Sequence, residues 1–429
     1  MISREGSIPS SETLIPQGWY ESTVGDVGKI KSGSTPLRAK SDDYFLNGSI
    51  PWVKTMDLNN GEIVTTDEKI TELALRETSC PLLEPGTVLV AMYGGFNQIG
   101  RTGLLTFRGT INQALSAIIV DEAQVLPKYL LYWLNSNVQK WRSFAASSRK
   151  DPNITRNDVS GFPIWIPPLP EQRQIAAILG TWDEAIRLTA DLIAAKQQRK
   201  KGLMQRLLSG EVRFPGFEAS SKRRKTRYFE MPMDWKLAPI GQIARQVNRR
   251  NTSQQALPVL SCMKHQGLVD SLEYFGRQIF SDDLSTYKIV ERGQFAYATN
   301  HIEEGSIGYQ HKYDEALISP MYTVFESTGD VDDRYLFRLL KTETYRKIFE
   351  LSTNASVNRR GSLRWNEFSH IEVPLPTREE QRRIADVLET CDQELSLLQQ
   401  KLAALQQQKK GLMQQLLTGR VRVKTTDDG

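Results

Sequence analysis

A duplicated segment constrains the fold of this chain more than any other sequence feature. The letters EQRQIA at 171–176 recur as EQRRIA at 380–385, and KKGLMQ at 200–205 recurs at 409–414. Both matches have the same offset of 209 residues, and about 24 of the 43 positions aligned from 171 and from 380 are identical. Internal repeats of this strength indicate that one structural unit occurs twice.

The similarity extends more weakly to either side of the repeat. Residues 85–90 parallel 291–296, and FPIWIP at 162–167 parallels IEVP at 371–374. The chain therefore reads as two halves, each a variable globular domain followed by a shared helix. Two copies of a unit tend to lie about a pseudo-two-fold axis, which suits two-part targets such as paired half-sites on DNA.

Each shared segment follows a proline-rich stop and then lacks proline, which predicts a long helix. Its apolar residues alternate in steps of three and four, a heptad pattern that needs a partner helix. Lys409 interrupts the pattern in the second copy, and Thr189, Lys196 and Lys200 interrupt it in the first. The predicted seam between the helices comprises Ile175, Leu179, Trp182, Ile186, Leu203, Leu207, Ile384, Leu388, Leu395, Leu402, Leu412 and Leu416.

Two arrangements satisfy this pattern. In one, each helix packs on the surface of its own domain; in the other, which the sustained heptad favours, the two copies pair with each other. A pseudo-two-fold axis would make the pair antiparallel, and the second helix would be roughly 57 Å long at 1.5 Å per residue. Such a pair would hold two domains apart. Gly210 and Gly419 lie where the helices are expected to stop.

The remaining sequence predicts two α+β domains with irregular, loop-rich sheets. Short β-like runs occur at 86–92, 115–120, 293–297 and 322–325, and helix-like stretches at 128–144 and 333–351. The expected organisation is a first domain at 1–166, a helical spacer at 167–214, a second domain at 215–373, a second spacer at 374–423 and a tail at 424–429.

Basic and amide side chains gather in two equivalent loops, each just before the proline that ends its domain. These side-chain types bind phosphates and read base edges. Solvated loop charges are the simpler interpretation of each single residue, but recurrence in both halves favours a DNA contact. The candidates are Arg149, Lys150, Asn153, Arg156, Asn157, Asn358, Arg359, Arg360 and Arg364. A basic run at 222–227 is expected to be a solvated linker or a nonspecific phosphate contact.

Composition and motifs narrow the function further. The net charge of +5 permits a nucleic-acid partner without demonstrating one, and three scattered cysteines fit a reducing cytoplasm. The sequence contains no run of about 18 apolar residues, so it predicts no membrane span. The sequence has no P-loop, no zinc-binding motif and no methyltransferase signature. His301, Glu303 and Glu304 precede glycine and predict a turn rather than a catalytic or metal site.

Two variable domains alternating with two near-identical helices, opened by EQR and closed by KKGLMQ, resemble the specificity subunit of type I restriction–modification systems. The resemblance implies a non-catalytic, DNA-binding subunit whose two target-recognition domains each read one half of a bipartite target. It also implies two methyltransferase partners and two motor-nuclease partners. S-adenosylmethionine, ATP and Mg²⁺ would be bound only by those partners, which methylate adenine and cleave DNA. In the family, segments matching 171–173, 201–204, 380–382 and 410–413 form the helix pair and contribute to partner docking.

Two other classes of function compete with this interpretation. A self-contained methyltransferase or nuclease is disfavoured by the missing motifs, and methylation by the purified chain alone would revive it. A scaffold that joins proteins without contacting DNA is the other alternative. A gel shift of this chain with its methyltransferase on random duplex DNA distinguishes that scaffold from a DNA-binding subunit.

Overall fold

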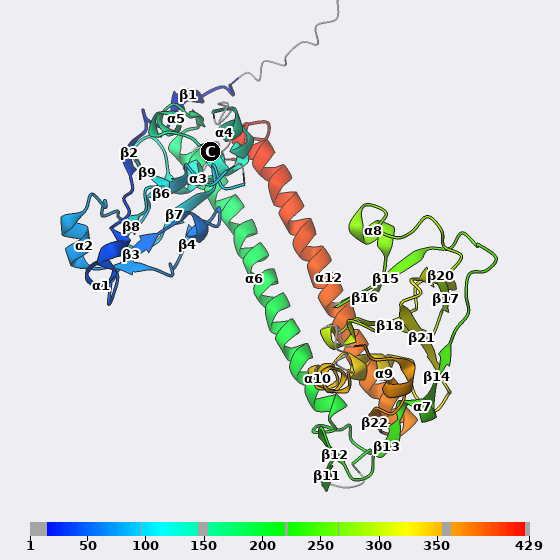
Figure 1. The fold of residues 1–429 in the computed structure, drawn as a ribbon. Helices are drawn as coiled ribbons and strands as arrows, with labels where there is room; N and C mark the ends of the chain where they lie inside the picture. Colours follow the sequence, from blue (N-terminus) through cyan, green and yellow to red (C-terminus); the bar gives the residue numbers. More distant parts are fainter. Residues whose placement is uncertain are drawn as a thin grey trace, which may run out of the picture. The chain divides into compact units, whose positions relative to one another are not determined.

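The computed structural model describes residues 15–95, 97–144, 153–218, 222–264, 266–353 and 362–424. The chain forms two compact units, and each takes residues from both repeats. The first unit comprises Met1–Ala190 with Gln400–Gly429, and the second comprises Asp191–Gln399. The two repeats form the long helices α6 (Leu169–Leu208) and α12 (Arg378–Leu417), drawn in green and in orange to red in Figure 1.

The first unit combines short strands with short helices. Its strands are β1 (Tyr20–Thr23), β2 (Gly28–Ser32), β3 (Ile50–Val53), β4 (Glu62–Ile63), β5 (Lys69–Ile70), β6 (Val88–Ala91), β7 (Thr102–Leu105), β8 (Thr110–Ile111), β9 (Leu115–Val120) and β10 (Pro163–Ile166). Its helices besides α6 and α12 are η1 (Arg38–Lys40), α1 (Ser41–Tyr44), η2 (Thr55–Asp57), α2 (Glu72–Glu77), α3 (Pro127–Ser136), α4 (Val138–Phe144) and α5 (Arg156–Ser160).

The second unit has the same kind of composition. Its strands are β11 (Arg223–Lys225), β12 (Glu230–Pro232), β13 (Lys236–Pro239), β14 (Ala244–Val247), β15 (Val259–Met263), β16 (Gly267–Asp270), β17 (Lys288–Glu291), β18 (Phe295–Ala298), β19 (Ile307–Tyr309), β20 (Glu315–Ile318), β21 (Tyr322–Ser327) and β22 (Glu372–Leu375). Its helices are α7 (Ile240–Ile243), α8 (Ser271–Phe275), η3 (Ile302–Glu304), α9 (Asp333–Leu340), α10 (Glu343–Ser352) and α11 (Trp365–Phe368).

Both units share the core of one sheet topology despite their different sequences, with β4 added to the first sheet of the first unit and β17 to the second sheet of the second unit. Strand order β2-β9-β6-β7 in the first unit corresponds to β14-β21-β18-β19 in the second, and every one of these pairs is antiparallel. A second sheet places β3 against antiparallel β5 and parallel β8, as β15 lies against β16 and β20. The pairs β1–β10 and β13–β22 join the start of each domain to its end. The structure therefore confirms the predicted α+β class with its internal repeat.

Each domain core extends onto the long helices. In the first unit Ile175 and Leu179 near the start of α6 share a buried cluster with Leu416 and Leu417 at the end of α12. In the second unit Leu207 and Leu208 at the end of α6 share a cluster with Ile384 and Leu388 near the start of α12. Within each unit the start of one helix thus packs with the end of the other, which is an antiparallel pairing.

Each long helix is followed by a glycine that no other residue can replace without strain. Gly210 and Gly419 both have φ of +65°, a left-handed conformation that side chains disfavour. A Cβ at Gly419 would lie 2.3 Å from Cγ of Pro16, and one at Gly210 would lie 2.5 Å from Cγ of Pro232. The helix ends therefore pass directly against the segment that enters each domain.

We expect Gly419→Ala to destabilise the chain more than Gly216→Ala. Both substitutions place a Cβ at positive φ, which costs about 1–2 kcal/mol. Only Gly419 adds a collision, because a Cβ at Gly216 meets nothing within 4 Å. Urea unfolding of the two variants measures the difference, and equal losses of unfolding free energy would show that the close approach to Pro16 is unimportant.

Candidate nucleic-acid interface and helix clasps

A buried carboxylate joins three distant segments of the first unit. Glu171, at the start of α6 and 3% exposed, accepts a hydrogen bond from Nε1 of Trp19 at 2.9 Å. It also accepts two from Arg422, which follows α12, at 2.7 and 2.8 Å. The Arg422 guanidinium lies 5.7 Å from the Trp19 ring centroid. We call this group the first clasp, because it fixes the end of α12 to the start of α6.

The second unit contains the same arrangement. Glu380, 1% exposed, accepts from Nε1 of Trp235 at 3.2 Å and from Arg213 at 2.8 Å through two guanidinium nitrogens. Arg213 also pairs with Asp234 at 2.7 Å and lies 5.7 Å from the Trp235 ring. The hydrogen bonds to Glu380 raise the pKa of Arg213. This second clasp fixes the end of α6 to the start of α12.

A buried amide follows each clasp carboxylate and holds the helix to its own domain. The Oε1 atom of Gln172 accepts from the amide of Leu126, the residue that caps α3, at 2.8 Å. The Oε1 atom of Gln381 accepts from the amide of Asp332, which caps α9, also at 2.8 Å. The two consecutive residues of each EQ pair thus make different contacts. The glutamate binds the arginine of the other repeat, and the glutamine binds a backbone amide of its own domain.

The predicted seam residues face the interior of the helix pair to different degrees. Trp182, Ile186, Leu203, Leu402 and Leu412 are partly exposed. The others are buried, namely Ile175, Leu179, Leu207, Ile384, Leu388, Leu395 and Leu416. Trp182, Ile186 and Leu402 lie away from the helix ends, whereas the partly exposed Leu203 and Leu412 still pack against the two domain cores.

The lysines that interrupt the heptads form ion pairs between the helices. Lys409 pairs with Asp183, which also accepts a hydrogen bond from the hydroxyl of Tyr132 at 2.7 Å. In the second unit Lys200 pairs with Asp392, the residue equivalent to Asp183. Because a polar seam residue is satisfied only opposite its partner, such pairs fix the register of a coiled coil.

Four of the nine DNA-binding candidates lie in the described part of the chain, and all four are exposed. They are Asn153, Arg156, Asn157 and Arg364. Within the described residues their side chains make no hydrogen bond or ion pair. Arg149, Lys150, Asn358, Arg359 and Arg360 lie outside the described residues.

The two candidate segments enter their domains at equivalent places. The amide of Ile154 donates to the carbonyl of Met92, directly after β6, at 3.0 Å. The amide of Leu363 donates to the carbonyl of Thr299, directly after β18, at 2.8 Å. A short helix follows each contact, α5 in the first unit and α11 in the second. The structure therefore brings each described set of candidates to the end of one central strand.

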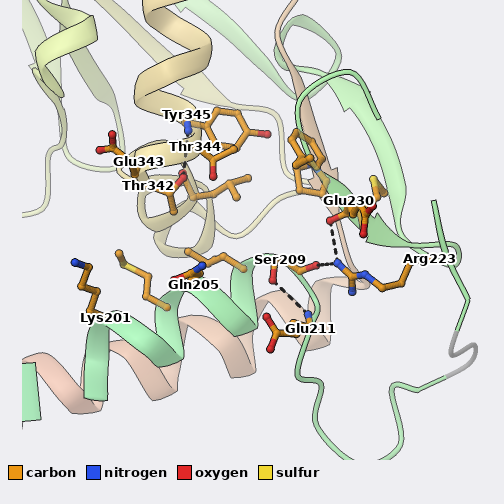
Figure 2. Close-up of a pocket in the computed structure, with 16 residues that line it drawn as sticks. Lys201, Gln205, Ser209, Glu211, Arg223, Glu230, Thr342, Glu343, Thr344 and Tyr345 are labelled. Carbon is orange, nitrogen blue, oxygen red and sulfur yellow. Dashed lines mark hydrogen bonds between the residues drawn. The ribbon is translucent and has the colours of Figure 1, made fainter. Parts of the chain in front are cut away.

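The basic run at 222–227 is not simply a solvated linker, contrary to the expectation from sequence. Arg223 donates to the carbonyls of Ser209, Gly210 and Glu230 at 2.8–3.0 Å, as Figure 2 shows in part. Arg224 donates to the carbonyl of Trp235 at 2.8 Å. Arginine satisfies helix carbonyls that lack a partner, so Arg223 acts as a cap for the end of α6.

A pocket of about 580 Å³ lies beside this cap in the second unit (Figure 2). Its apolar lining comes from Met204 and Leu208 of α6, Phe229 before β12, Leu339 of α9 and Tyr345 of α10. Lys201 and Gln205 of α6 form a polar rim in the same pocket. The pocket therefore borders residues that belong to the repeated KKGLMQ segment.

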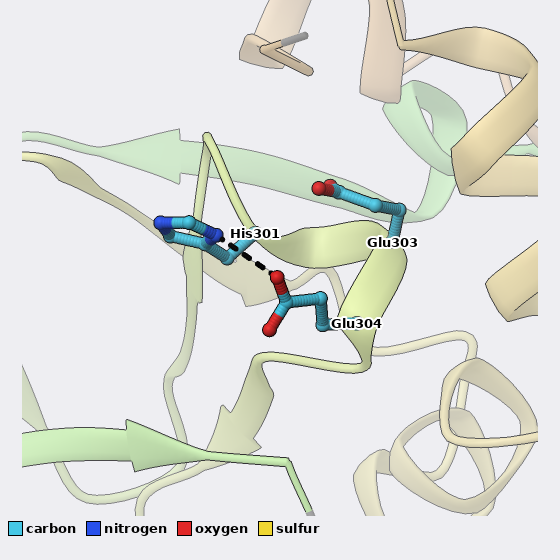
Figure 3. A group of neighbouring side chains, drawn as sticks. All are labelled: His301, Glu303 and Glu304. Carbon is cyan, nitrogen blue, oxygen red and sulfur yellow. Dashed lines mark hydrogen bonds and ion pairs between the residues drawn. The ribbon is translucent and has the colours of Figure 1, made fainter. Parts of the chain in front are cut away.

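His301, Glu303 and Glu304 form the turn that the sequence predicts. Ile302–Glu304 is a single 3-10 turn, and Gly305 follows it with φ of +92°. Figure 3 shows Glu304 turned toward His301, with 3.3 Å between the two groups. The ligand atoms of all three residues lie within 4.8 Å of one another. The His301 and Glu304 side chains are 52% and 61% exposed, so the pair is solvated.

Packing among the described residues does not require glycine at two positions inside the long helices. Gly202 lies in α6 and Gly411 lies at the equivalent position of α12. A Cβ built at either meets no atom within 4 Å. Glycine inside a helix costs about 1 kcal/mol relative to alanine, so the chain bears this cost twice.

Sequence reasoning missed the clasp arginines, although both lie inside the aligned repeat. Arg213 and Arg422 are identical across the repeat and follow the helix-ending glycines. That identity was the available signal, but nothing in one repeat shows that the partner carboxylate belongs to the other.

No described helix is both long enough and apolar enough to cross a membrane.

We expect Glu380→Gln to destabilise the second unit strongly, by roughly 3 kcal/mol, because it leaves the buried Arg213 without its main charge partner. Glu343→Gln is the matched control, since it removes a carboxylate whose ion pair with Arg346 is exposed. Water screens such a pair, so the control should lose far less stability. Unfolding free energies from urea titration measure both, and similar losses would contradict the structural role of the clasp.

The comparisons with known proteins agree with this architecture. The family described as type I restriction modification DNA specificity domain matches residues 16–196 and 273–407. The MjaVIII specificity subunit of a type I restriction enzyme from Methanocaldococcus jannaschii is 27% identical over 427 residues, covering 96% of this chain and 94% of that protein. The putative MjaX specificity subunit of the same organism is 26% identical over 425 residues, covering 96% and 95%.

A solved structure shows the same fold. The S subunit of a type I restriction–modification system from M. genitalium superposes with a TM-score of 0.56 at 15% identity, covering 97% of this chain and 99% of that chain. The family match spans well over half of the sequence and includes the first part of each repeat. The chain therefore belongs to the family of type I restriction–modification DNA specificity subunits.

Proposed function

We propose that this chain reads a bipartite DNA target, with one target-recognition domain at 1–166 and the other at 215–373. The shared strand order of the two units supports a common way of presenting a reading surface. The different sequences on that shared topology support two different half-sites. The exposed arginine and amide side chains after β6 and β18 have the chemistry that grips phosphates and base edges.

The paired helices set the distance between the half-sites and dock the partners. Two methyltransferase subunits bind the helices, and two motor-nuclease subunits complete the complex in the cytoplasm. This chain directs their adenine methylation and ATP-dependent cleavage and itself performs no catalytic step. S-adenosylmethionine, ATP and Mg²⁺ belong to the partner subunits.

One observation carries the proposal: two clasps each join the start of one repeat to the end of the other. Glu171 binds Arg422, and Glu380 binds Arg213, with equivalent geometry. A chain in which each helix served only its own domain would have no need of this exchange. The exchange supports a paired spacer that carries a different domain at each end.

A map of methylated adenines in host DNA tests the proposal. Cells that carry the gene should methylate adenines in one two-part motif with a fixed spacer of unspecified bases. Deletion of this gene alone should abolish that methylation. A map that is unchanged by the deletion would contradict a role in target recognition.

Shortening both helices should shorten the unspecified spacer. Removal of 186–192 from α6 and 395–401 from α12 deletes one heptad at equivalent positions and leaves both clasps intact. Each helix loses roughly 10 Å at 1.5 Å per residue, which corresponds to about three base pairs. The methylated motif should keep both half-sites with the shorter spacer, whereas an unchanged spacer would refute the helices as the determinant of spacing.

Truncation of the exposed side chains on α5 should weaken DNA binding by the first domain. Arg156→Ala removes a cation that no described residue pairs, and the slope of the salt dependence of binding should fall by about one for each phosphate that is no longer neutralised. Arg108→Ala is the control, because Arg108 is exposed but pairs with Glu84. Fluorescence anisotropy of the complex with methyltransferase over a salt series measures both. Equal behaviour of the two variants would remove Arg156 from the interface.

A further inference from the structure

Two positive charges lie directly opposite each other at an edge of the second domain. Arg250 forms an isolated antiparallel bridge with Lys288 of β17, so the two side chains project from the same face. Like charges paired in this way across two extended segments destabilise the fold. Among the described residues neither side chain has a carboxylate partner, so this cation pair lacks a counter-ion.

The preceding arginine shows the opposite case. Arg249 binds the carboxylates of Glu291 and Glu315, each at 2.5 Å. Successive side chains of an extended segment point to opposite faces, so Arg250 points away from these two carboxylates. The fold thus neutralises one of the two consecutive arginines and leaves the other without a partner.

The backbone on both sides of Arg250 is fixed. The amide of Ile289 donates to the carbonyl of Arg249 at 2.8 Å, and the amide of Asn251 donates to the carbonyl of Tyr287 at 2.9 Å. Asn251 is fully buried. Arg250 therefore cannot move away from the lysine by a shift of its backbone, and the two charges stay together.

The lysine of the pair is held as well. Lys288 is partly buried, and its Nζ atom donates to the carbonyl of Tyr322 at 2.5 Å. Burial lowers the pKa of the Lys288 ammonium, and the neighbouring Arg250 guanidinium lowers it further. An anion bound between the two groups would offset both effects.

The cation pair lies at the edge of the domain that carries the predicted DNA contacts. The lysine binds the carbonyl of Tyr322, and the preceding carbonyl, that of Met321, accepts from Oγ1 of Thr299 at 3.1 Å. The carbonyl of Thr299 in turn accepts from the amide of Leu363, and the candidate Arg364 follows. A short chain of hydrogen bonds thus connects the pair to the exposed arginine after β18.

The first unit has no such pair at the equivalent places. Strand register aligns β2 with β14, and Gly33 and Ser34 lie where the second unit has Arg249 and Arg250. Lys288 belongs to β17, the strand added to the second sheet of the second unit. In the described part of the chain, this cation pair therefore belongs to the second domain alone.

We propose that Arg250 and Lys288 bind one backbone phosphate of the half-site read by the second domain, and that the first domain lacks this anchor. The inference rests on the proposed function and adds that the two half-sites are held unequally. A phosphodiester supplies the missing counter-ion, since a guanidinium binds two of its oxygens and an ammonium adds a point charge. An uncharged base edge would leave the repulsion in place, so the anchor positions the duplex without reading its sequence.

The test replaces single phosphates by neutral methylphosphonates along a duplex that carries the methylated motif. Fluorescence anisotropy measures the affinity of the chain assembled with its methyltransferase. At one position, in one half of the motif only, the replacement should weaken wild-type binding about tenfold, as expected for a lost charge-assisted contact. The Arg250→Ala variant should bind the duplex modified at that position as well as it binds the unmodified duplex.

Three further variants separate an anchor from general attraction. Lys288→Met should behave as Arg250→Ala does, and the double variant should lose roughly the same affinity as either single variant, because both cations bind one phosphate. Arg245→Ala is the control, since it removes the same charge from an exposed arginine that pairs with Glu326. The control should keep the sensitivity to the methylphosphonate.

A thermal melt of the isolated chain separates binding from folding. The melting temperature of Arg250→Ala should not fall, because the substitution removes a repulsion. A fall in melting temperature together with the loss of affinity would assign Arg250 a structural role and overturn the anchor.

Four binding results would also overturn it. One is a duplex that is bound normally but has no position whose sensitivity depends on Arg250; this leaves the proposed function standing. Another is a dependence on Arg250 in both halves of the motif, and a third is a double variant whose losses add. The fourth is inorganic phosphate that raises the melting temperature through Arg250 while no duplex phosphate depends on it, because the site then binds a free anion. If the assembled complex does not retain the duplex at all, the proposed function fails together with the anchor.

Discussion

A buried glutamate at the start of each long helix is the interaction on which the structure depends. Glu171 and Glu380 are almost fully removed from water, and a buried carboxylate is costly unless a cation and hydrogen-bond donors satisfy it. The indole of the entering segment supplies one donor, and the arginine after the opposite helix supplies the charge. Each glutamate is thus satisfied only when both repeats are present, so the antiparallel pairing follows from the need to neutralise it.

The division of labour along the chain follows from this constraint. Some residues that meet the other repeat, such as Glu380 and Lys200, are the same in both copies and meet equivalent partners. Others differ: Lys196, which pairs with Glu394, corresponds to a leucine at 405. The domains keep only their strand order and the buried positions that dock on the helices. The loops of the two domains differ in sequence, and this difference supports two separate reading surfaces on one scaffold. The family membership places that scaffold among DNA specificity subunits.

The sequence was informative where a pattern is local and silent where a partner is distant. The heptads predicted two long helices, and short β-like runs predicted the strands near 88 and 295. Lys409 looked like a flaw in its heptad, because its partner Asp183 lies in the other repeat. Arg223 looked like part of a solvated linker, because no local pattern shows that the carbonyls ending α6 lack partners. All nine DNA-binding candidates stay predictions, and five of them lie outside the described residues.

Hydroxyl-radical footprinting tests the central claim most directly. The chain, assembled with its methyltransferase, would be bound to a duplex that carries its methylated motif, and backbone protection would be read on both strands. The account predicts two protected tracts, one over each half of the motif, separated by exposed positions in the unspecified spacer. A single protected tract over one half-site, with the other half cleaved as in free DNA, would contradict two domains that read the duplex together.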